Sequence, residues 1–217
     1  MESIAHIISP LNAAWSGWVM LLLLLCAVLG EYIQPGVVLQ SVQSLRPRLE
    51  RTYKDAPNNF LAQLLITLFR IGTLALALCL CLCADGAFSL TAFAAICGVV
   101  IAFLGAKMLC NLIVDHTFML SQRFMPLYEH YANIFTITTC VLYPCLLVLL
   151  RVGSPTASWW VLGAVAVLFL LLWMYRSASV FVRSPLTVIY YLLYFVTLEV
   201  LPIGVLLYFS MQIVTLI

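Results

Sequence analysis

The sequence predicts an all-helical bundle of about six membrane spans, and its composition and apolar pattern carry this prediction. The chain has 217 residues, of which 65% are hydrophobic and 8% charged, with a mean hydropathy of +1.14. Soluble domains carry about 25% charged residues, so this composition excludes a water-soluble fold. The apolar runs are continuous instead of alternating, which favours helices over the strands of a membrane barrel. We therefore expect one integral membrane domain over residues 1–217, without a separate soluble domain.

Six apolar runs are long enough to cross a bilayer, which takes about 20 residues of helix. The first run ends at Gly30 and Glu31, shortly before Pro35, and the second stops at Asp85 and Gly86. The predicted spans cover residues 14–29, 60–84, 88–109, 131–150, 158–175 and 186–212.

The basic residues outside the spans predict the orientation. Eight of them fall in three loops on one side, and only Arg151 falls on the other. Because cytoplasmic loops carry an excess of Lys and Arg, these three loops are predicted to be cytoplasmic and both termini non-cytoplasmic. The eight residues are Arg46, Arg48, Arg51 and Lys54 after the first span, Lys107 and Arg123 after the third, and Arg176 and Arg183 after the fifth.

The first cytoplasmic loop, residues 36–56, has its own helical pattern of apolar residues. One interpretation is an amphipathic helix in the membrane interface, whose basic residues favour anionic headgroups. The equally weighted alternative is a solvated connector that folds against the bundle. The apolar positions are Val38, Val42, Leu45, Leu49 and Tyr53, and the basic ones are Arg46, Arg48, Arg51 and Lys54.

The cysteines and the net charge argue against a cofactor or nucleic-acid partner. All eight cysteines lie in apolar segments, where free cysteine behaves as a small hydrophobe. In the run Cys79, Cys81, Cys83 only the first and last share a helical face, and structural zinc usually needs four converging ligands. The formal charge of +2 is too small to indicate nucleic-acid binding. We expect neither a metal nor a cofactor.

A carboxylate inside the last span is the first candidate for a functional site. Glu199 lies 13 residues after Leu186, about 20 Å along a helix from its cytoplasmic end. Ionisable groups at such depth usually have a partner or a function. Tyr191 lies two turns away, and Pro202 cannot donate to the carbonyl of Leu198. The sequence therefore predicts a polar intramembrane site at this point.

Arg70 is the predicted counter-ion of Glu199. It lies 10 residues into the second span, about 15 Å from the same cytoplasmic side. Three alternatives stay open at this stage. In the first, Arg70 extends to the membrane interface and does not pair with Glu199. In the second, Glu199 is protonated and bonded to a tyrosine. In the third, the pair forms but serves only to lock helix packing.

A second candidate is a polar stripe at the cytoplasmic end of the third span. Lys107, Asn111 and Asp115 are four residues apart, and His116 follows. One hypothesis is a headgroup or ion site at the membrane surface. The alternative, favoured because charges near span ends are usually solvated, is the wet face of a helix that leaves the bilayer.

The segment from Tyr194 to Pro202 resembles the closing motif of an uncharacterised family of bacterial multi-pass inner-membrane proteins, found chiefly in Bacteroidota and known only as a domain of unknown function. The family pattern reads approximately Tyr-Leu-Cys-Thr-Leu-Glu-Ile-Leu-Pro, and here Phe195 and Val196 replace the Leu and Cys. The stretch from Tyr131 to Pro144 is similar to the family's fourth span. The resemblance implies a bacterial inner-membrane location, and it supplies no activity.

The sequence lacks a nucleophile elbow, a glycine-rich phosphate loop and a His-Glu-x-x-His pair. We therefore expect a non-catalytic component of cell-envelope biogenesis or assembly that contacts lipid and other membrane proteins. One alternative is a small transporter or proton-coupled carrier that uses Glu199 and Arg70. A second alternative is a lipid-modifying enzyme that acts through the Lys107–His130 region.

Overall fold

The computed structural model describes residues 14–43, 59–82, 89–118, 121–152, 154–181, 196–197 and 201–216. Within these ranges the chain forms seven helices and no strand, which confirms the predicted all-helical fold. The helices are α1 (Ala14–Ile33), α2 (Val37–Gln43), α3 (Phe60–Leu82), α4 (Leu90–Phe118), α5 (Ser121–Val152), α6 (Pro155–Phe181) and α8 (Leu201–Leu216).

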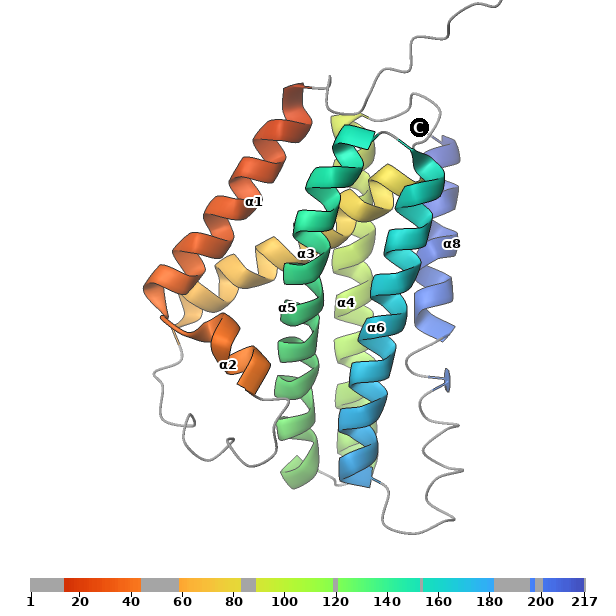
Figure 1. Cartoon of the computed structure of the whole chain (residues 1–217). Helices are drawn as coiled ribbons and strands as arrows, with labels where there is room; N and C mark the ends of the chain where they lie inside the picture. The colour runs from red at the N-terminus through yellow and green to blue at the C-terminus, as the bar shows by residue number, and fades with distance from the viewer. Residues whose placement is uncertain are drawn as a thin grey trace, which may run out of the picture.

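The long helices run alternately up and down as drawn in Figure 1. The end of the bundle where α1, α4 and α6 begin is called the upper end, and the opposite end is called the lower end. Helix α8 finishes at the upper end, where α1 starts (Figure 1). The excess of basic residues in the sequence assigns the lower end to the cytoplasm, and this assignment stays a prediction.

Five of the helices, α1, α3, α4, α5 and α6, are long and apolar enough to cross a membrane. The apolar part of α8, Leu201–Gln212, is shorter. Most of the first half of the sixth predicted span, residues 186–200, lies outside the described residues. The chain is thus a multi-pass membrane protein built as a helical bundle.

The helices extend beyond the predicted spans because hydropathy marks the hydrocarbon boundary and not the end of a helix. Helix α6 begins at Pro155 because the hydroxyl of Ser154 caps it, accepting from the Ala157 N–H at 3.4 Å, and proline suits a first helical position. Helix α1 continues past its apolar run to Ile33. Helix α5 continues through Pro144 to Val152, although Pro144 has no N–H to donate to the Cys140 carbonyl.

Helix α3 occupies the centre of the bundle. In its membrane-spanning window 67% of the residues are buried, against 11% in α4 and in α6. It contacts α1, α4, α5, α6 and α8. Small side chains let the neighbouring backbones approach closely, which is how helices associate in lipid. The small buried residues of α3 are Ala62, Gly72, Thr73, Ala75, Ala77, Cys79 and Cys81.

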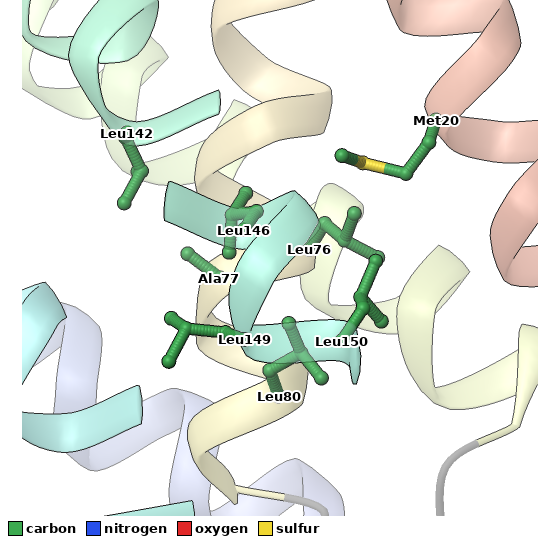
Figure 2. Packing of buried hydrophobic residues seen from close by; sticks show 8 residues of the cluster. All are labelled: Met20, Leu76, Ala77, Leu80, Leu142, Leu146, Leu149 and Leu150. Atoms are coloured by element: carbon green, nitrogen blue, oxygen red, sulfur yellow. The ribbon is translucent and has the colours of Figure 1, made fainter. Parts of the chain in front are cut away.

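One apolar cluster joins α1, α3 and α5 near the upper end. Figure 2 shows the leucines of α3 and α5 pointing towards one another, with Met20 reaching in from α1. Such contacts stabilise the bundle through close packing, because lipid is as apolar as leucine and gives no hydrophobic driving force. The cluster contains Met20, Leu76, Ala77, Leu80, Leu142, Leu146, Leu149 and Leu150.

Two glycines fix the approach of α1 to α3. A Cβ atom on Gly30 would lie 2.9 Å from Ile66 Cγ1, and one on Gly72 would collide with the side chain of Leu23. Each helix therefore places one bulky side chain against a glycine of the other. This close approach also sets the position of Arg70, two residues before Gly72.

We expect Gly72→Ala to destabilise the protein by about 1–3 kcal/mol, because the added methyl group overpacks the contact with Leu23. Gly98→Ala is the matched control, since a Cβ at Gly98 of α4 meets nothing within 4 Å. The measurement is the thermal midpoint of the purified protein in detergent. Equal midpoints for the two variants would contradict the proposed packing role of Gly72.

Candidate functional site

Arg70 is held inside the bundle by a threonine of α5. Its side chain is 8% exposed, and its Nη2 atom donates to Thr136 Oγ1. The Thr136 hydroxyl donates its own proton to the Ala132 carbonyl oxygen at 2.9 Å, so an oxygen lone pair accepts from the arginine. A guanidinium at this position carries a positive charge, because arginine does not deprotonate in proteins.

The next turn of α5 towards the lower end binds α2. Ser41 of α2 is fully buried, and its hydroxyl donates to the Val37 carbonyl oxygen at 2.9 Å. The same hydroxyl lies 3.3 Å from the side-chain amide oxygen position of Asn133. A hydroxyl has one proton, so both contacts are satisfied when the Asn133 amide presents its NH₂ group to the serine oxygen.

Glu31 fixes the start of α2 from the end of α1. Its two carboxylate oxygens accept from the backbone N–H groups of Gly36 at 2.7 Å and Val38 at 3.2 Å. These N–H groups belong to the first turn of a helix, where no carbonyl of the helix itself can accept them. A carboxylate there is also favoured by the positive end of the helix dipole.

Cys140 of α5 lies one turn beyond Thr136 and packs against α1 and α3. It packs on a cluster that contains Leu23, Cys26 and Phe69. We call these polar residues of α1, α2, α3 and α5 the Arg70 cluster: Glu31, Ser41, Arg70, Asn133, Thr136 and Cys140.

The structure describes only part of the site predicted around Glu199. Glu199 and Tyr191 lie outside the described residues, so the pairing of Glu199 with Arg70 stays a prediction. Pro202 is the second residue of α8 and is half-buried. The burial of Arg70 is compatible with that pairing.

Sequence reasoning missed the partners of Arg70 on α5. A usable signal was present, since Asn133, Thr136 and Cys140 are three and four residues apart and thus share one face of a helix. The face they form could not be matched to Arg70 from the sequence, because serines and threonines occur in most of the predicted spans.

Lys107, the first residue of the predicted polar stripe, is buried against an aromatic ring. It is 9% exposed, and its Nζ atom lies 4.0 Å from the ring centroid of Tyr131, which is a cation–π contact. Tyr131 packs edge-to-face on Trp173 and Phe169 of α6, with centroid distances of 5.2 and 5.4 Å. The lysine therefore belongs to a junction of α4, α5 and α6.

The other members of the stripe follow Lys107 along α4. Asn111, Asp115 and His116 lie in this helix, which continues to Phe118, and the placement of their side chains is outside the described residues. The basic residues Arg46, Arg48, Arg51 and Lys54, predicted to meet anionic headgroups, also lie outside the described ranges.

Within the described ranges no three residues of the His, Cys, Asp and Glu types are grouped so that they could hold a metal ion. Cys79 and Cys81 are buried in α3, and Cys83 lies outside the described part.

Comparison with known families supports the resemblance noted in the closing motif. A family model with the description Domain of unknown function (DUF4271) matches residues 17–209. Neither a curated protein nor a solved structure matches the chain.

We expect Thr136→Val to lower the stability of the protein by about 1 kcal/mol, since valine keeps the shape but removes the acceptor of Arg70. Thr138→Val is the matched control. Thr138 is similarly buried, and its hydroxyl donates to carbonyls of its own helix, at 2.5 Å for Ile134. The thermal midpoint of both variants in the same detergent tests this, and a larger loss in the control would contradict it.

Replacement of Tyr131 separates its ring from its hydroxyl. Tyr131→Phe keeps the ring under the Lys107 ammonium group and should be tolerated, whereas Tyr131→Leu should destabilise the protein by about 1 kcal/mol or more. Thermal unfolding of both variants provides the comparison. If phenylalanine proves as harmful as leucine, the hydroxyl and not the cation–π contact stabilises this junction.

Proposed function

We propose that the chain, which belongs to the family described as Domain of unknown function (DUF4271), is a non-catalytic component of cell-envelope biogenesis or assembly. We further propose that it resides in the bacterial inner membrane, on the basis of the closing motif and the one-sided distribution of basic residues. Its partners in this proposal are the lipid bilayer and other membrane proteins.

The observation that carries the proposal is that polar groups at membrane depth join helices to one another. Arg70 of α3 bonds Thr136 of α5, and the Tyr143 hydroxyl of α5 donates to the Met20 carbonyl oxygen of α1 at 2.9 Å. Ser41 of α2 contacts Asn133, again on α5. Each of these contacts joins another helix to α5, which is what a protein needs to keep a fixed shape for a partner.

The outer face of α1 supports a role in lateral contacts. Of its membrane-spanning window 28% is buried, and its exposed side is apolar except for the hydroxyl of Tyr32. Such a face is suited to lipid or to the helices of another membrane protein. The exposed large side chains are Trp18, Leu21, Leu22, Leu24, Leu25, Val28, Leu29 and Tyr32.

The proposal is tested by replacing Glu199 with glutamine in a strain that lacks the native gene. An assembly component should keep its function in Glu199→Gln, because packing needs a hydrogen-bonding group and not a titrating one. The wild type and the variant should both co-purify from native membranes with the same envelope protein in a fixed ratio. The proposal is contradicted if Glu199→Gln no longer restores the function of the strain that lacks the gene, although the variant is inserted in the membrane at the wild-type level.

A second candidate, a small proton-coupled carrier, is favoured by the buried guanidinium of Arg70 at membrane depth. For a carrier, Glu199→Gln should abolish transport while the protein still inserts, since glutamine cannot take up and release a proton. Arg70→Lys should then retain part of the transport, because the positive charge is kept. The same complementation assay thus separates the two candidates.

A further inference from the structure

We infer that α2 is a lid that closes the Arg70 cluster from the lower end of the bundle. Helix α2 lies between the end of α1 and the middle of α5 (Figure 1), and it contacts both. Through Ser41 it contacts Asn133, the residue of the cluster that lies nearest the beginning of α5. The inference concerns access to the cluster and holds whether the protein is an assembly component or a carrier.

The order of residues along α5 gives the depth of each layer. Asn133 meets α2, Thr136 meets Arg70 one turn further in, and Cys140 follows after another turn. The seven residues from Asn133 to Cys140 correspond to about 10 Å of helix. A water-borne reagent from the lower end would therefore have to pass α2 before it reached the Cys140 thiol.

Two contacts hold the lid closed. The first is the pair of hydrogen bonds from the N–H groups of Gly36 and Val38 to the Glu31 carboxylate, at 2.7 and 3.2 Å. The second is the contact of the fully buried Ser41 with Asn133 at 3.3 Å. One latch lies at the beginning of α2 and the other near its end.

Two buried polar atoms destabilise the closed position of α2, which lowers the free energy needed to open it. Gln34 Oε1, just before α2, and Gln43 Oε1, at its last residue, are buried and have no hydrogen-bond donor in the described part of the chain. A buried acceptor without a donor has lost its hydration and gained nothing in return, which costs more than a typical hydrogen bond contributes. When α2 moves away, both amides regain water, so the loss of the latches is partly offset.

The link between α1 and α2 has the geometry of a hinge. Gly36 has a φ of 89°, a conformation that other residues rarely adopt, and Pro35 before it stops α1. On its outer side α2 exposes Val38, Leu39 and Val42, whose apolar side chains keep the helix at the membrane surface in either position.

The test measures how fast a charged, water-soluble maleimide modifies Cys140 in the full-length protein in lipid nanodiscs, read by peptide mass spectrometry. Ser41→Ala and Asn133→Ala both remove the second latch, the Ser41–Asn133 contact, and each should raise the Cys140 rate about threefold to tenfold. Glu31 is left unchanged, so that its bonds with Gly36 and Val38 hold the start of α2 in every variant.

A second pair of variants should change the rate in the opposite direction. Gln34→Met and Gln43→Met replace the buried acceptors without donors by apolar side chains of similar length, so they favour the closed lid. The Cys140 rate should fall by a similar factor. This arm keeps the inference testable even if removal of a latch impairs folding.

The controls are internal to the protein. Val42→Ala changes the outer side of α2 and should leave the Cys140 rate unchanged, and exposed Cys110 of α4 should react equally in every variant. Cys81, buried in α3, should stay unreactive. The lid is overturned if Cys140 reacts at the wild-type rate in both latch variants, or if Cys81 becomes reactive together with it.

Discussion

The enclosure of α3 is the constraint on which the rest of the bundle depends. A helix surrounded by other helices in a membrane has neither water nor headgroups for its polar groups, so each of them must be satisfied by the protein. The hydroxyls of Thr67 and Thr73 bond carbonyls of their own helix, at 2.7 and 2.6 Å. Arg70 is too large and too strongly charged for that solution, and it bonds α5 instead.

Helix α5 is the counterpart of α3 because it supplies polar partners to three other helices. Its face carries Asn133, Thr136 and Tyr143, which meet α2, α3 and α1 respectively. Membrane helices gain little from apolar burial against each other, so such bonds and close packing decide which helices are neighbours. The small residues of α3 and the polar residues of α5 thus act together in fixing one arrangement.

The buried cations are unevenly distributed along the bundle. Arg70, Lys107 and Arg176 are all buried. Lys107 and Arg176 lie in the second halves of α4 and α6, the two helices that finish at the lower end (Figure 1). Lys107 is fixed by the ring of Tyr131, and Arg70 by a hydroxyl. The buried Lys107 and Arg176 distinguish the lower half of the bundle from the upper half, where the leucine cluster of Figure 2 lies.

Composition and continuous apolar runs were enough to predict an all-helical membrane protein, because they leave no other solution in a bilayer. The sequence also identified Arg70 and Lys107 as residues of interest, since charges near or within apolar spans are unusual. It did not indicate that α3 is the central helix, that Thr136 accepts from Arg70, or that Glu31 and Ser41 bind α2 to the bundle. The physical reason is that membrane helices are apolar on every side, so their sequences carry little periodic signal of which face meets protein and which meets lipid. Only the tertiary structure, through close contacts such as Gly72 with Leu23, decided the neighbours and hence the site.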